Sequence, residues 1–149
     1  MTKTVSKLII LFPCTYVVHI AEEYWAGERF FNWLSRVANS NMTEDSFLLL
    51  NGVFMFIMII ATSIAIWQRD HRIVLVLASI VTINTLLHIL GSIFTYSYSP
   101  GLISAVVLWL PLAAWAFYHE RRYTSARQRL GAILAGIVAH VLVSVSALL

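Results

Sequence analysis

The chain has 149 residues, of which 60% are hydrophobic and only 11% are charged. A soluble domain carries about 25% charged residues, so this composition excludes an ordinary water-soluble protein and predicts an integral membrane protein. The length suits a single domain over residues 1–149. The net charge of +3 arises from lysines and arginines at the ends of apolar segments, which membrane topology explains without nucleic-acid binding.

The first apolar segment, about residues 5–25, follows Lys3 and Lys7 and has the outline of a signal peptide. The stretch HIAEE offers no pair of small residues for cleavage, and Phe12 and Pro13 occupy positions where a lipoprotein signal has small residues. We therefore expect this segment to be retained as a transmembrane helix.

Five apolar segments are long enough to cross a bilayer, which predicts an all-α, polytopic, five-helix transmembrane bundle. The expected spans are residues 5–25, 46–67, 72–94, 101–118 and 130–149. The connection over residues 26–43 contains Phe30, Trp33, Leu34 and Val37 at helical spacing. This spacing predicts a helix along the outer interface, and the alternative is an irregular loop.

The positive charges predict the orientation of the bundle. With a cytoplasmic N-terminus, the inner segments contain Lys3, Lys7, Arg69, Arg72, Arg121, Arg122, Arg127 and Arg129. Only Arg29 and Arg36 then lie outside. Because lysine and arginine are enriched on the cytoplasmic side, the sequence predicts a protein of the inner cell membrane with its N-terminus inside and its C-terminus outside.

Polar side chains on four of the expected helices occur at a similar depth. At about 1.5 Å per residue, they lie roughly 16 to 24 Å from the inner face. These residues are His19, Glu22, Glu23, Asn51, Asn84, His88 and His140. Helical spacing of three or four residues places His19 with both glutamates on one face, and Asn84 with His88 on another. Ionisable groups avoid lipid, so we expect a polar pocket that opens to the outer side.

Each of these residues also has a simpler interpretation. Glu23 would be solvated if it reaches the outer interface, near Trp25. Asn51 and Asn84 would join neighbouring helices by hydrogen bonds, and His140 would be a packing residue on an aliphatic helix.

The pentapeptide HIAEE, residues 19–23, resembles the signature of the HXXEE family of small bacterial membrane proteins. The stretch NTLLHILGSIFTYSYSPGLISAVVLWLP, residues 84–111, is similar to that family's second block, in which a helical histidine precedes Tyr-x-Pro-Gly and a helix ending near a proline. The resemblance points to His19, Glu22, Glu23, His88, Tyr98, Pro100 and Gly101. It implies no particular reaction.

Two histidines and a carboxylate form a suitable ligand set for a divalent metal ion, Zn²⁺ or non-haem iron. The expected ligands are His19, His88, Glu22 and Glu23, and the glutamate that does not bind the metal would act as a general base or orient one of the ligands. Asn51, Asn84, Tyr98 and His140 are expected to line the pocket. The sequence thus favours a metal-dependent membrane enzyme whose hydrophobic or lipid-like substrate enters from the outer leaflet.

Three other functions remain open. A buried neutral glutamate and a histidine could act without metal in an isomerase or cyclase. The same side chains could serve a proton- or cation-coupled transporter or sensor, for which five helices without an internal repeat would favour a homo-oligomer. The chain could also be an assembly partner whose polar residues join helices. The lipid bilayer is the expected surrounding in every case.

Overall fold

The computed structural model describes residues 5–148, and every regular element in this range is helical. The elements are η1 (Lys7–Ile10), α1 (Leu11–Trp25), α2 (Phe30–Ala38), α3 (Glu44–Gln68), α4 (His71–Thr95), α5 (Leu102–Ser104), η2 (Ala105–Trp109), α6 (Leu110–Glu120) and α7 (Ala126–Leu148). Lys3, one of the expected inner charges, and Leu149, the expected end of the last span, lie outside the described residues.

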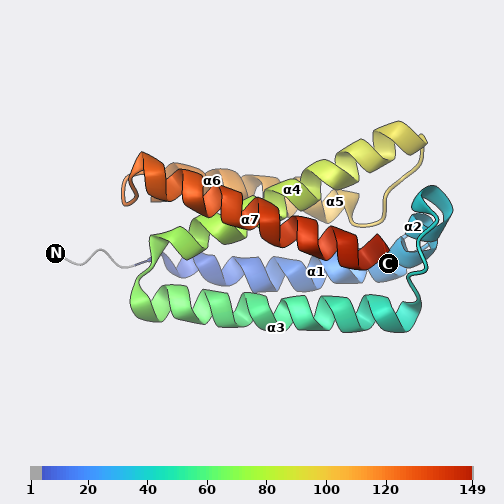
Figure 1. Cartoon of the computed structure of the whole chain (residues 1–149), viewed down its shortest axis with the longest axis horizontal. Coiled ribbons are helices and arrows are strands. Elements are labelled where there is room, and N and C mark those ends of the chain that lie inside the picture. Colours follow the sequence, from blue (N-terminus) through green and yellow to red (C-terminus); the bar gives the residue numbers. More distant parts are fainter. Residues whose placement is uncertain (1–4, 149) are drawn as a thin grey trace.

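Helix α1 and the longer helices run along the long axis of the molecule (Figure 1). The turn η1 lies at one end, and the last residues of α7 lie at the other end together with α2. We call these the N-terminal end and the α2 end. Helix α4 packs against α6 and α7, while α1 packs against α3 and the short helix α5. Helices far apart in sequence, such as α1 and α5 or α4 and α7, therefore lie side by side.

Four helices are long and apolar enough to cross a membrane: Glu44–Gln68, His71–Thr95, Leu102–Glu120 and Ala126–Leu148. They correspond to the second to fifth expected spans. Helix α1 has 15 residues and continues the four-residue 3₁₀ turn η1, so it is shorter than these four. The sides of α3 and α7 that face away from the bundle are covered with exposed aliphatic side chains, as a lipid-facing surface requires.

The ends of the long helices follow from local chemistry. Thr43 and Ser46 form a reciprocal capping box at the start of α3 and satisfy two backbone N–H groups there. Asp70 caps α4 by accepting a hydrogen bond from the Arg72 N–H group at 2.9 Å. Acidic and hydroxyl side chains at these positions are what the N-terminus of a helix favours.

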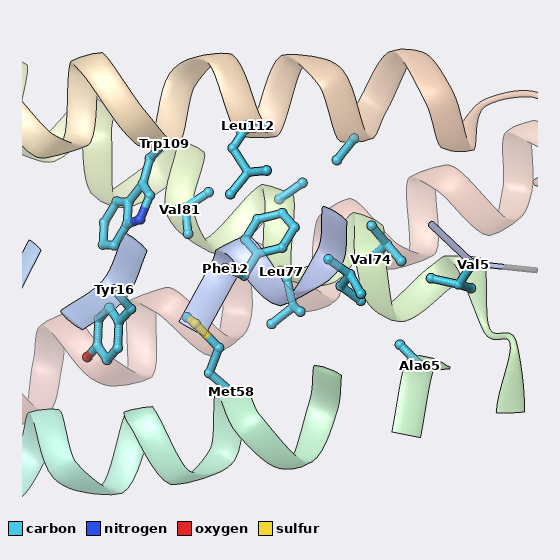
Figure 2. Packing of buried hydrophobic residues seen from close by; sticks show 14 of the residues in the cluster. Val5, Phe12, Tyr16, Met58, Ala65, Val74, Leu77, Val81, Trp109 and Leu112 are labelled. Atoms are coloured by element: carbon cyan, nitrogen blue, oxygen red, sulfur yellow. The ribbon is translucent and has the colours of Figure 1, made fainter. Parts of the chain in front are cut away.

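The hydrophobic core lies around α1 in the half of the bundle nearer the N-terminal end (Figure 2). Phe12 is fully buried there, among side chains from α3, α4 and α6. Towards the α2 end, Trp109 stacks on Tyr16 with 6.0 Å between ring centroids. This core fixes α1 against its neighbours and thereby sets the position of the polar residues one to two turns further along the same helix.

Residues Ala105–Trp109 form a turn of π-helix within the helix that runs from Leu102 to Glu120. Pro111 follows it, in the first turn of α6. Proline has no N–H group and disturbs the preceding turn, which the wider π-helix accommodates. The Ala105 carbonyl accepts a backbone hydrogen bond from the Leu110 N–H group and a second hydrogen bond from the Thr85 hydroxyl at 3.3 Å.

Candidate metal centre

Three ionisable side chains from α1 and α4 converge near the α2 end of the bundle. His19 is fully buried, and Glu23 and His88 are nearly so. The Nε2 atoms of both histidines lie 3.4 Å from the same carboxylate oxygen, Oε1 of Glu23. One ligand atom from each residue lies within 4.8 Å of the others, so the three could hold one metal ion. We call these residues the His₂Glu cluster.

Two serine hydroxyls orient the imidazole rings. Nδ1 of His19 lies 2.9 Å from Oγ of Ser104, and Nδ1 of His88 lies 2.8 Å from Oγ of Ser99. The Ser104 hydroxyl also donates to the Gly101 carbonyl at 3.2 Å, so it accepts the hydrogen bond from the His19 Nδ1–H group. His19 then presents the lone pair of Nε2 to Glu23, and this nitrogen has no hydrogen-bond partner among the described residues.

The spacing within the His₂Glu cluster is compatible with a bound metal ion. Hydrogen bonds from N–H to oxygen are usually 2.7–3.2 Å long, which is shorter than the two contacts of 3.4 Å. Two ligand atoms at about 2.0–2.1 Å from a tetrahedral ion lie about 3.3–3.4 Å apart. Outer partners such as the two serines are also typical of metal-binding histidines.

Gly101 explains why the loop before α5 can lie against the cluster. Its φ of +96° is in the left-handed region, which glycine adopts without strain. A Cβ atom at this position would lie 2.7 Å from Cε1 of His19 and 3.0 Å from Cε1 of His88. It would also lie 2.9 Å from Cγ of Glu23. Only a glycine therefore permits this close approach.

The structure separates the two adjacent glutamates. Glu22 points away from the His₂Glu cluster and accepts hydrogen bonds from the backbone N–H groups of Ile103 at 2.9 Å and Ser104 at 2.6 Å. The Tyr98 hydroxyl also donates to Glu22. Burial and the Glu22 carboxylate raise the pKa of Tyr98, which therefore stays protonated as a donor. Glu22 thus holds the start of the Leu102–Glu120 helix, where a carboxylate is favourable.

A cavity of about 360 Å³ adjoins the His₂Glu cluster. Asn51, Asn84 and His140 line it, whereas Tyr98 lies beside Glu22 and outside the lining. Most of its wall is aromatic or aliphatic and comes from α2, α3 and α7. Trp33 of α2 packs over Gly91, where a Cβ atom would lie 2.7 Å from the indole ring, so α2 covers the cavity.

The sequence did not reveal several residues that build the site. Ser99 and Ser104 orient the histidines, and Trp109 packs on His19 with 3.9 Å between ring centroids. Serine is common at turns and in helices, so neither serine stands out from its position alone. The one feature of the sequence that could have identified these two serines is their position next to the Pro-Gly turn after Tyr98.

A second His–Glu group lies at the N-terminal end. Glu120, at the end of α6, is fully buried. It contacts Nδ1 of His71 at the start of α4 and Nδ1 of His119, the latter at 3.0 Å. His71 stacks on Tyr123 with 4.5 Å between ring centroids. This group joins α4 to α6 far from the cavity.

The fold and the site define an all-helical protein with four helices suited to cross a membrane and a buried cluster of two histidines and one glutamate. The family model described as "Protein of unknown function with HXXEE motif" matches residues 10–116, and the chain belongs to this HXXEE family. The match confirms the resemblance drawn from HIAEE and contains the whole His₂Glu cluster. Comparisons with curated proteins and with solved structures found no match.

Proposed function

We propose that the protein is an integral membrane enzyme that binds a divalent metal ion at His19, Glu23 and His88. Its substrate is a hydrophobic small molecule that reaches the cavity from the outer leaflet. The observation that carries this proposal is the convergence of two imidazole nitrogens on one carboxylate oxygen, each at 3.4 Å, in a buried site. Acceptor atoms that face one another in a buried site require a cation or a proton between them.

The ligand set indicates the chemistry. Two histidines and one carboxylate occur in catalytic zinc sites and in non-haem iron sites, and both leave a position open for water or substrate. A bound metal ion lowers the pKa of its water towards about 7 and polarises a substrate oxygen. Because the cluster lines a mainly apolar cavity, the reacting group of a hydrophobic molecule would meet this position.

We propose that α1 is a fifth membrane span and that α2 lies at the outer interface of the inner cell membrane. Helix α1 runs beside α3 along the long axis, from the N-terminal end towards α2 (Figure 1). The described arginines at the α2 end, Arg29 and Arg36, are paired with Glu44 at 3.3 Å and Glu28 at 2.7 Å. The excess positive charge therefore belongs to the N-terminal end, which supports a cytoplasmic N-terminus and an outer C-terminus.

One observation favours a metal-free acid–base enzyme as the second candidate. The His19 ring lies over Trp109 with 3.9 Å between centroids, and an indole face stabilises a cation such as protonated histidine. In that case Glu23 and the two histidines share a proton, and the cluster exchanges it with the substrate.

Elemental analysis of protein purified in detergent separates the two candidates. The metal enzyme should contain about one zinc or iron ion per chain, and His19→Ala and His88→Ala should each lose most of it. His119→Ala is the matched control, because this histidine also contacts a buried carboxylate but lies at the N-terminal end. Metal below about a tenth of an ion per chain in wild-type protein, even after incubation with zinc and iron salts, would rule out the metal proposal.

A further inference from the structure

Two polar side chains in the cavity wall lack hydrogen-bond partners among the described residues. Oδ1 of Asn84 is buried and unpaired. His140 is only 4% exposed, and its ring makes no hydrogen bond to another described residue. Both residues line the cavity that contains the His₂Glu cluster. A buried polar group without a partner is unfavourable, so two such residues in the wall of one cavity indicate a ligand that supplies the missing bonds.

A third polar residue in the wall provides the contrast. Oδ1 of Asn51 accepts a hydrogen bond from the Tyr16 hydroxyl at 2.8 Å, and its amide donates to the Phe47 carbonyl at 3.0 Å. Asn51 is therefore satisfied within the protein. Of the two asparagines in the lining, only Asn84 has a carbonyl that remains available to a ligand.

The unpaired atoms specify the polar group of the ligand. The Asn84 carbonyl oxygen only accepts hydrogen bonds, so the ligand must donate one. A neutral imidazole has one donor and one acceptor nitrogen, and a hydroxyl group, which donates and accepts, satisfies Asn84 and His140 together. An ionised carboxylate has no proton to donate.

The charged residues in the cavity wall also favour an uncharged ligand over an anionic one. The described lining residues include the carboxylate of Glu23 and no lysine or arginine. Apart from the proposed metal ion, nothing in the described lining would balance the charge of a carboxylate or phosphate, so an anion beside Asn84 and His140 would be unfavourable. Around this polar group the wall is formed by rings and aliphatic chains such as Phe30, Trp33, Phe47 and Leu50, which suit an apolar body.

We infer that the cavity selects an uncharged hydroxyl-bearing amphiphile, such as a long-chain alcohol, and that Asn84 and His140 bind its hydroxyl group beside the His₂Glu cluster. This inference rests on the proposed function in treating the cavity as the substrate site. It adds the chemical class of the substrate and two specificity-determining residues that do not bind the metal ion.

The test compares ligands that share one tail. Protein in nanodiscs is titrated with ω-bromododecanol, ω-bromododecanoate and ω-bromododecylamine, and quenching of tryptophan fluorescence by bromine gives the dissociation constants. The alcohol should bind at least about tenfold more tightly than the carboxylate in metal-depleted protein, and than the amine in metal-loaded protein. The carboxylate cannot donate to Asn84 and the ammonium cannot accept from His140, and one unmade buried hydrogen bond has about that effect. Trp33→Phe should remove the saturable part of the quenching, since Trp33 lines the cavity, whereas ligand dissolved in the lipid quenches exposed residues such as Trp25 and Trp67 without saturation.

Two variant pairs assign the preference to particular side chains. Asn84→Leu should reduce the preference for the alcohol to about threefold or less, whereas the matched variant Asn51→Leu should retain it. His140→Leu should weaken alcohol binding about tenfold, and His140→Gln, which keeps a donor and an acceptor, should restore most of it. This second pair remains informative if Asn84→Leu does not fold.

Several outcomes would overturn the inference. These are equal or tighter binding of the carboxylate by metal-depleted protein or of the amine by metal-loaded protein, an unchanged preference in Asn84→Leu, or saturable quenching that persists in Trp33→Phe. Titrations are made with metal-depleted and metal-loaded protein. A hydroxyl preference in protein that binds no metal would refute the proposed metal chemistry and support this binding site, so the two failures are distinguishable.

Discussion

At the scale of single residues, two adjacent glutamates have different tasks. Glu23 lies four residues after His19 and completes the His₂Glu cluster with His88. Glu22 lies three residues after His19, and its oxygens accept hydrogen bonds from Tyr98 and from the start of the Leu102–Glu120 helix. Glu23 thus offers a candidate metal ligand. Glu22 instead holds the segment from Tyr98 to Ser104, which contains the two serines that bond to the histidines.

Glutamine substitutions should separate these tasks. Glu23→Gln should lower the metal content to less than about a tenth of the wild-type value, because a neutral amide binds Zn²⁺ or iron much more weakly than a carboxylate does. Glu22→Gln should keep the metal but lower the melting temperature, since an amide nitrogen cannot accept the backbone hydrogen bonds. Elemental analysis and thermal unfolding in detergent measure both effects. Equal loss of metal in the two variants would contradict this division.

Gly101 is the residue whose replacement should disturb the cluster without removing a ligand. Gly101→Ala places a Cβ atom within 3.0 Å of all three cluster residues, so the metal content should fall severalfold. Gly27→Ala is the matched control, because Gly27 also has a positive φ, of +61°, but its Cβ atom would contact only Tyr98 at 3.5 Å or more. Both variants share a backbone strain of about 1–2 kcal/mol. Metal retained in Gly101→Ala would show that the close approach is not required.

At the scale of elements, α4 is the centre of the bundle and α7 closes the cavity against it. The two helices approach closely at Gly136, where a Cβ atom would lie 2.5 Å from Cβ of Ser79 and 2.8 Å from the Val76 carbonyl oxygen. Small residues permit such contacts between membrane helices. The position of His140, one turn after Gly136, depends on this contact.

Gly136→Ala should therefore destabilise the bundle by about 1–3 kcal/mol, as overpacking does at other tightly packed sites. The matched variant Gly131→Ala, on the same helix, places its Cβ atom where no other atom lies within 4 Å and should not destabilise. Thermal unfolding of both variants in detergent gives the comparison. A lower melting temperature in Gly131→Ala than in Gly136→Ala would contradict the packing of α7 on α4.

The sequence predicted elements better than contacts. Expected spans of 46–67 and 72–94 agree closely with α3, Glu44–Gln68, and α4, His71–Thr95, because apolar length and capping residues are local properties. The contact of His19 with Ser104 joins residues 85 positions apart, and periodicity contains no such information. Helical spacing placed Glu22 and Glu23 on the same face as His19 and could not tell which of them joins the cluster. The segment after α4 decides this, because it binds Glu22 and leaves Glu23 to the two histidines.

At the scale of the whole molecule, two His–Glu groups lie at opposite ends of the bundle. The His₂Glu cluster has an adjoining cavity and lies near α2, whereas Glu120 with His71 and His119 joins α4 to α6 at the N-terminal end. The proposed orientation places the cavity in the outer half of the membrane. It also places the end that contains Arg121, Arg122 and the start of α7 in the cytoplasm.

Labelling of single cysteines tests this orientation and the fifth span. Lys7→Cys, Asn41→Cys and Gln128→Cys, each in a Cys14→Ser background, place thiols at exposed positions. A membrane-impermeant maleimide should label Asn41→Cys in intact cells, and the other two only after the membrane is opened. Labelling of both Lys7→Cys and Asn41→Cys in intact cells would show that α1 does not cross, and labelling of Gln128→Cys without Asn41→Cys would show the reverse orientation.

The most direct measurement of the proposed metal centre is X-ray absorption at the edge of the metal found in purified protein. The predicted result is one ion per chain with nitrogen and oxygen ligands at about 2.0–2.2 Å, including two imidazoles, one of which disappears in His88→Ala. Protein without a stoichiometric metal ion, or a spectrum that keeps two imidazoles in His88→Ala, would contradict it.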